Sequence, residues 1–77
     1  MPTKAGNWEQ RARQFLKAEL KRADVTYEEL AIRLKKLGLE ETEASIANKL
    51  VRGTFPATFL LAVATAIGLE GIKLEDI

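Results

Sequence analysis

The stretch TYEELAIRLKKLGLEETEASIANKLVRG, residues 26–53, predicts two helices joined by a turn. Thr26, followed three residues later by Glu29, has the spacing of a capping box at a helix start. Glu29 and Arg33 are spaced for an i,i+4 ion pair, and Gly38 is typical of a residue that ends a helix. The apolar residues at helical spacing predict a buried seam, formed by Tyr27, Leu30, Ala31, Leu34 and Leu37.

The second helix of this stretch is expected over residues 43–52, with Thr42 as its N-cap and Gly53 at its end. Steps of about 100° per residue divide it into two sides. The side expected to face inward carries Ala44, Ile46, Ala47, Leu50 and Val51. The side expected to face solvent carries Thr42, Ser45, Asn48, Lys49 and Arg52, while Glu43 falls outside this polar arc.

On the N-terminal side of this stretch, residues 1–6 are expected to be a flexible tail, and residues 7–77 a single helical domain. A chain of 77 residues has room for one core. A helix begins at about Asn7, and its inward side is predicted to contain Trp8, Ala12, Phe15, Leu16, Leu20 and Ala23.

Residues 54–68, TFPATFLLAVATAIG, predict a fourth helix with Pro56 in its first turn and Gly68 at its end. Residues 71–77 are expected to form one short helical turn that lays Ile72, Leu74 and Ile77 on the core. No strand pattern competes with this interpretation. The predicted fold is therefore all-α, a compact bundle of four to five helices.

Composition excludes several classes of function. The chain contains no cysteine and no histidine, so the familiar nucleophile–base pairs and zinc sites have no residues to form them. We expect no enzyme activity, no cofactor, no metal and no small-molecule ligand. The chain shows no signal-peptide pattern and no apolar run long enough to span a membrane, so we expect a cytoplasmic protein that does not bind membranes.

The polar side predicted for residues 43–52 matches the chemistry of nucleic-acid recognition. Asn can bind adenine through two hydrogen bonds, Arg or Lys can bind guanine, and Ser or Thr can reach bases or phosphates. The hypothesis assigns DNA contacts to Thr42, Ser45, Asn48, Lys49 and Arg52, with Lys35 and Lys36 near phosphates. A solvated helix face with no ligand is the alternative.

The order of these segments resembles a known family. LKRADVTYEELAIRL is similar to the first half of the phage-repressor-like helix-turn-helix family (the Cro/C1 or XRE type), and IANKLVRGTFPATFLLAVATAIG and the residues after it are similar to the second half. The likeness covers about residues 14–77 and implies a lambda-repressor-like fold that binds double-stranded DNA, plausibly as a transcriptional regulator. The chain is also similar to a family of short, uncharacterised bacterial proteins with an NKLxRGTF-type segment.

Three features depart from that helix-turn-helix pattern. Leu34 and Ile46 are farther apart than the equivalent positions of the family, which predicts a lengthened second helix or turn. Tyr27 replaces the family's usual Gln. The start of the third helix is acidic, with Glu40, Glu41 and Glu43, which would repel phosphates.

Two further features leave alternatives open. The side of the fourth helix that carries Leu61, Ala62 and Thr65 is a candidate homodimer interface, or is covered within the monomer. Glu19 is expected either at the wet edge of the first helix's seam or paired with Lys49 or Arg52. The alternative function is a protein–protein interaction or dimerisation domain of the same fold without DNA binding.

Overall fold

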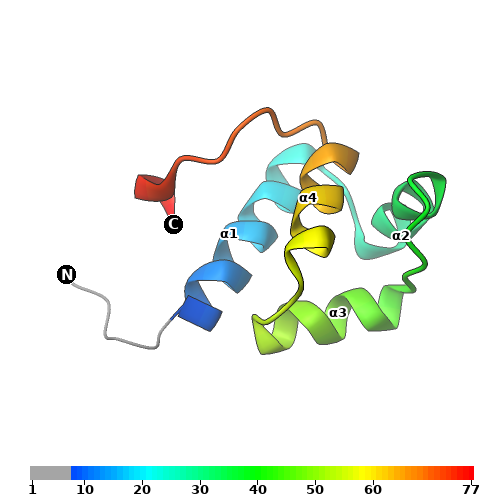
Figure 1. The fold of residues 1–77 in the computed structure, drawn as a ribbon, viewed down its shortest axis with the longest axis horizontal. Coiled ribbons are helices and arrows are strands. Elements are labelled where there is room, and N and C mark those ends of the chain that lie inside the picture. Colours follow the sequence, from blue (N-terminus) through cyan, green and yellow to red (C-terminus); the bar gives the residue numbers. More distant parts are fainter. Residues whose placement is uncertain (1–7) are drawn as a thin grey trace.

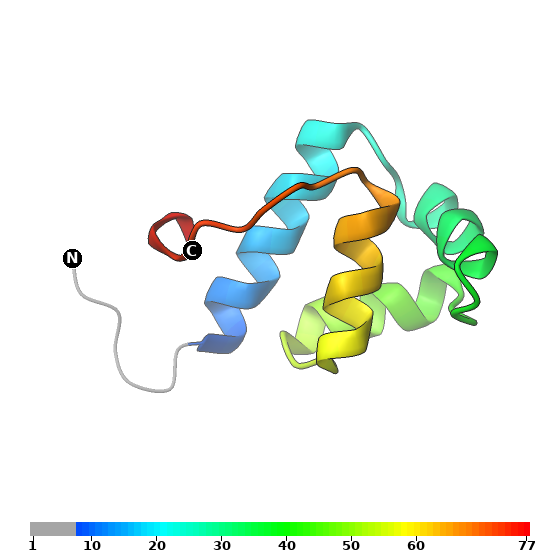
Figure 2. The ribbon, with the colours of Figure 1, turned by 45° about the horizontal axis from the view of Figure 1, so that its top comes forward.

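The computed structural model describes residues 8–77, apart from the side chain of Asp76; the tail predicted for residues 1–6 and the helix start predicted at Asn7 lie outside this range. Within it the chain is all-helical and contains no strand, which confirms the predicted fold class (Figures 1 and 2). The elements are α1 (Trp8–Ala23), α2 (Tyr27–Lys36), α3 (Glu43–Arg52), α4 (Ala57–Ala66) and a short 3-10 turn, η1 (Leu74–Asp76).

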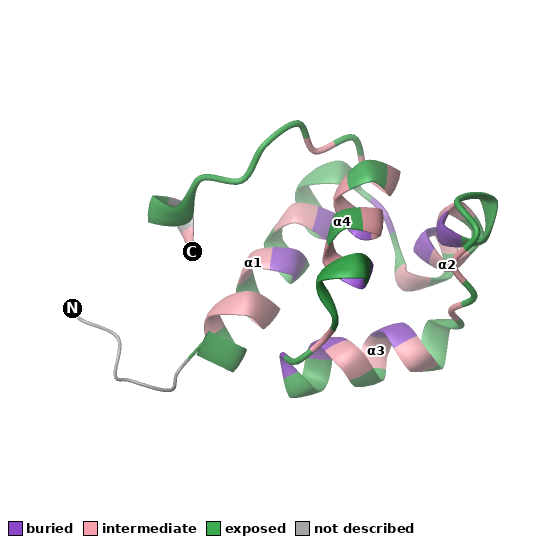
Figure 3. Ribbon diagram, viewed as in Figure 1, coloured by how far each residue is buried: buried purple, intermediate pink, exposed green. Residues whose placement is uncertain are grey.

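The four α-helices enclose one apolar core. α3 packs against α1 and α2, and α4 packs against α2. The buried segments of α1, α2 and α3 face the interior of this arrangement, as Figure 3 shows by colour. Burial of apolar area is the main favourable term in folding, so these contacts hold the bundle together. The core residues are Leu16, Leu20, Val25, Leu30, Leu34, Ile46, Leu50, Phe59 and Val63.

The capping box predicted at the start of α2 forms only in part. The Oγ1 atom of Thr26 accepts a hydrogen bond from the backbone N–H of Glu29 at 3.1 Å, which satisfies one of the free donors of the first turn. The reciprocal half of the capping box does not form. The carboxylate of Glu29 instead pairs with Nε of Arg33 at 3.0 Å, the i,i+4 pair expected from the sequence.

The chain reverses direction at the end of α2, and Leu37 is therefore not part of the buried seam predicted for this helix. Gly38 adopts φ +87°, its N–H bonds to the carbonyl of Lys35, and the N–H of Leu39 bonds to the carbonyl of Leu34. This Schellman arrangement turns the chain outward at Leu37, which is 49% exposed. Leu39 takes the inward place that the helical spacing had assigned to Leu37.

Both ends of α1 were predicted to be more buried than they are. Trp8, the first residue of α1, is 60% exposed and lies under the guanidinium of Arg11, 4.2 Å from the ring centroid. Ala23 is exposed because the helix ends there and Asp24 turns the chain with φ +60°. That turn directs Val25 into the core instead.

The C-terminal part of the chain also departs from the prediction. Pro56 is the N-cap of α4, one position before the helix in which it was expected. The short helical turn predicted for residues 71–77 forms as η1, but Ile72 and Leu74 are 36% and 77% exposed, so these two side chains do not lie on the core as predicted. Together with Ile77 they border an apolar gap of about 230 Å³ beside α1 and α4.

Candidate functional site

The helix α3 is the candidate functional element. It runs along one edge of the molecule in both views of the ribbon (Figures 1 and 2). Ile46 and Leu50 anchor it, with relative exposures of 0% and 1%. Asn48 and Arg52 are exposed, so these two predicted contact residues are available to a ligand.

The solvent-facing side of α3 is rotated relative to the predicted one. Val51 is 68% exposed and Ala44 is also exposed, although both were predicted to face inward. Ser45 and Lys49 were predicted to face solvent, but both are half-buried. The reason is that α3 has neighbours on two sides, so the boundary between its buried and exposed faces does not coincide with its hydrophobic pattern.

Lys49 is held by a small polar network. Its ammonium lies 3.1 Å from the carboxylate of Glu41 and 5.5 Å from the ring centroid of Phe59. The hydroxyl of Ser45 donates to the same carboxylate oxygen at 2.6 Å. Because the Glu41 side chain is only 9% exposed and that of Lys49 is 23% exposed, the charge of Lys49 is neutralised within the protein. The assignment of Lys49 as a free contact residue therefore does not fit this geometry.

The side-chain hydroxyls at the start of α3 form hydrogen bonds with the helix's own backbone. The Oγ1 atom of Thr42 accepts from the N–H of Ser45 at 3.1 Å, and Oγ of Ser45 accepts from the N–H of Thr42 at 2.8 Å. This is a complete capping box. Thr42 is exposed, yet both hydroxyls already have partners in the helix N-terminus.

Two contacts with α1 fix the other end of α3. Arg13 donates from Nη1 to the carbonyl of Val51 at 2.9 Å, which satisfies one of the free acceptors of the last helical turn. Gly53 ends the helix with φ +70°, and the backbone of Glu9 lies directly against it. Neither contact was predicted from the sequence, because each joins residues far apart in the chain.

The cations at the end of α2 divide into two groups. Lys35 and Lys36 are exposed, and neither forms an ion pair with any of residues 8–77 whose side chains are described. Arg33 instead donates to the carbonyl of Ala66 at 3.0 Å and so ties α2 to the end of α4. Lys35 and Lys36 are the cations of α2 that remain available to an external anion.

The residues proposed for an oligomer interface differ in their exposure. Leu61 is 63% exposed, and Thr65 is exposed with its hydroxyl donating to the carbonyl of Leu61 at 2.9 Å. Ala62 is half-buried and packs against the core. Only Leu61 therefore offers a large apolar side chain at this position.

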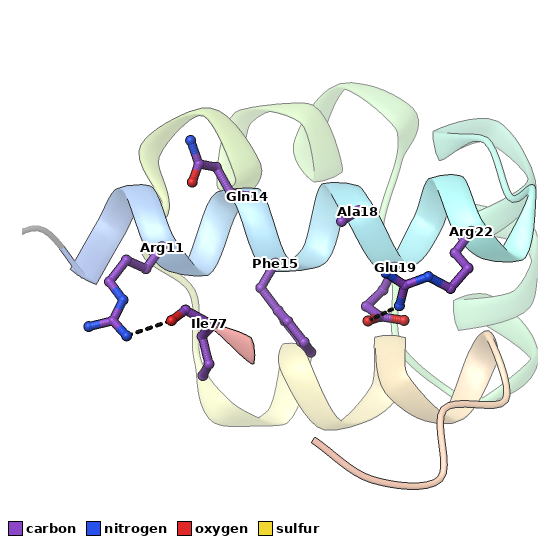
Figure 4. Close-up of a pocket in the computed structure, with 7 residues that line it drawn as sticks. All are labelled: Arg11, Gln14, Phe15, Ala18, Glu19, Arg22 and Ile77. Atoms are coloured by element: carbon purple, nitrogen blue, oxygen red, sulfur yellow. Dashed lines mark hydrogen bonds and ion pairs between the residues drawn. The ribbon is translucent and has the colours of Figure 1, made fainter. Parts of the chain in front are cut away.

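A hollow of about 420 Å³ follows one face of α1 (Figure 4). Its charged groups have partners within the chain: Glu19 pairs with Arg22 at 2.6 Å, and Arg11 donates to the backbone oxygen of Ile77 at 2.5 Å. Glu19 therefore has neither of the partners considered from the sequence, Lys49 and Arg52. The uncharged side chains of Gln14, Phe15 and Ala18 complete the lining of the hollow.

The described side chains contain no cluster of three or more His, Cys, Asp or Glu residues that could hold a metal ion. None of the helices within residues 8–77 has the length and apolar character needed to cross a bilayer.

Comparison with known proteins places the chain in a family. A family model described as a domain of unknown function, DUF6471, matches residues 8–72. The chain belongs to the DUF6471 family. The match begins with α1 and ends before η1, so the four-helix bundle is the part of this chain that the DUF6471 model covers. No curated protein and no solved structure matched the chain.

Proposed function

We propose that this DUF6471 chain is a small DNA-binding module, a transcriptional regulator of the helix-turn-helix type, in which α3 enters the major groove. The observation that supports this most directly is the exposure of Asn48 and Arg52 on a helix whose opposite side is fully buried. A helix braced against a second helix, with polar residues projecting from its free side, is the arrangement used by helix-turn-helix proteins. Here α2 packs against α3, which supports this proposal.

The exposed cations provide the phosphate contacts of this proposal. Lys35 and Lys36 lie at the end of α2, and Arg52 is the last residue of α3. Contacts to phosphates fix the register of a protein on the duplex and make its affinity fall with salt. Lys49 is left out of this set because Glu41 already neutralises it.

The acidic residues near the start of α3 limit the affinity that we expect for DNA. Glu40 and Glu43 are exposed, and neither pairs with a cation among the described side chains. Their charges repel phosphates, so we expect weak binding to arbitrary DNA. Selectivity in this proposal comes from base contacts rather than from a strongly basic surface.

The test is duplex binding by the full chain at several salt concentrations. We expect binding at about 50 mM salt that weakens steeply as salt rises. The variant Arg52→Ala with Lys36→Ala removes two exposed cations, which should weaken binding and lower its salt dependence without unfolding the chain. Lys73→Ala, an exposed cation outside the helices, is the control. Failure to bind any duplex at low salt would refute the proposal.

A protein-interaction or dimerisation domain is the second candidate function. The exposed Leu61 on α4 supports this alternative, because it borders a shallow hollow together with Leu69 and Ile72 and contiguous apolar surface often marks protein contacts. Light scattering over a range of protein concentrations distinguishes the two. A dimer that dissociates in Leu61→Ser, in a protein that does not bind DNA, would favour this second function.

A further inference from the structure

The exposed stripe of α3 consists of different residues from the polar arc that its sequence suggested. Ala44, Asn48 and Val51 are spaced at i, i+4 and i+7, which places them on one face of the helix. All three are exposed, and Arg52 lies next to them at the helix end. The stripe therefore presents one amide between two aliphatic side chains.

The other polar groups of α3 are already occupied. The hydroxyls of Thr42 and Ser45 form the capping box, and Lys49 is paired with Glu41. Asn48, in contrast, forms no side-chain hydrogen bond with any residue in the described part of the chain. It is the amide on this face that remains able to bind a base edge.

An amide flanked by methyl groups complements an A·T base pair in the major groove. Adenine offers N7 as an acceptor and N6 as a donor, which one Asn side chain can bind together. Thymine offers a C5-methyl group, which aliphatic side chains such as Ala contact favourably. G·C pairs have no methyl group there, so the aliphatic part of the stripe gains nothing from them.

Building on the proposed DNA-binding function, we propose that α3 reads A·T pairs, with Asn48 bound to adenine and the methyl groups of Ala44 and Val51 placed against thymine methyl groups. This makes Val51 a specificity-determining residue, although its apolar character had suggested a place in the core. An exposure of 68% leaves most of this side chain free to be covered by DNA.

The experiment begins with selection of bound duplexes from a random pool by the full chain. We expect the enriched site to contain A·T pairs. Uracil is then substituted for individual thymines of that site, which removes only the C5-methyl group. Loss of one contacted methyl should weaken binding about fourfold, from the transfer free energy of a buried methyl group. Asn48→Ala should weaken binding about tenfold and reduce the preference for adenine at one position.

Val51→Ala supplies the residue-specific control. It should reduce the difference between thymine and uracil at one position of the site, because alanine keeps only the Cβ methyl group, while leaving other positions unchanged. Leu61→Ala, which removes an exposed aliphatic side chain from α4, should keep that difference in full.

The outcomes separate this inference from the function on which it rests. An enriched site without A·T pairs, or equal affinity for thymine and uracil duplexes, would overturn the A·T inference while DNA binding itself stands. Absence of any enrichment, together with absence of salt-dependent duplex binding, would overturn the proposed function and the inference with it.

Discussion

Replacing Gly53 by alanine should destabilise the bundle far more than the same change at Gly38. Both residues have positive φ, +70° and +87°, so an added Cβ atom costs about 1–2 kcal/mol of backbone strain at either position. At Gly38 a Cβ atom would have no atom within 4 Å. At Gly53 it would lie 2.6 Å from the carbonyl carbon of Glu9 and 2.9 Å from its Cα atom, and closer still to the carbonyl oxygen.

The difference in lost stability between the two variants reports how closely α1 approaches α3. Ordinary contact begins at 3.4 Å, so the first turn of α1 must move away from Gly53. Since the clashing atoms are backbone, no side-chain rotation relieves them, and forced overpacking of this kind costs about 1–3 kcal/mol. We therefore expect a loss of about 1–2 kcal/mol for Gly38→Ala and about 2–5 kcal/mol for Gly53→Ala.

Urea unfolding followed by circular dichroism at 222 nm measures both losses. A domain of this size has about 3–5 kcal/mol of stability, so Gly53→Ala is expected to be partly unfolded in buffer. Addition of sulfate, which strengthens burial, brings both variants into a measurable range. Equal losses for Gly53→Ala and Gly38→Ala would refute the close approach of α1 to α3 and, with it, the contact that positions the end of α3.

Three further predictions concern the candidate site and its supports. Lys49→Met should lower the free energy of unfolding by about 1–3 kcal/mol, because Glu41 is left largely buried without its cation; urea unfolding checks this, with Lys36→Met as an exposed control whose stability should not change. Glu43→Gln should strengthen duplex binding at low salt by about twofold to fivefold, since it removes an exposed negative charge from the start of α3; unchanged affinity in fluorescence anisotropy would contradict the placement of α3 against the duplex. Thr26→Ala should cost about 1 kcal/mol by removing the hydroxyl that caps α2, and thermal unfolding measures the loss.

Local chemistry accounts for what could be predicted of the fold. The cap at Thr26, the chain reversal at Gly38 and the helix end at Gly53 each depend on residues a few positions apart. Such signals do not need the rest of the molecule, because free backbone groups at helix ends must be satisfied nearby. The helical periods of α2 and α3 likewise identified the most deeply buried residues of each helix, Leu30 and Leu34 in α2 and Ile46 and Leu50 in α3.

The exact orientation of each helix could not be predicted in the same way. A hydrophobic pattern identifies the most buried line along a helix but not how far burial extends to either side of it. In α3 that extent is set by neighbours distant in sequence, so Val51 became exposed and Lys49 became half-buried against Glu41 and Phe59. The same limit applies to Leu37, whose exposure depends on the turn that follows it.

The sequence by itself therefore determined that this chain forms helices, where α2 and α3 begin and end, and that histidine and cysteine chemistry is absent. The tertiary structure decided which groups of α3 are free to meet a ligand. The physical reason is that caps and periodicity are satisfied within one or two helical turns, whereas the availability of a side chain depends on every element packed around it. Asn48 and Arg52 remain available, Lys49 and Ser45 are occupied, and Ala44 and Val51 join the exposed face.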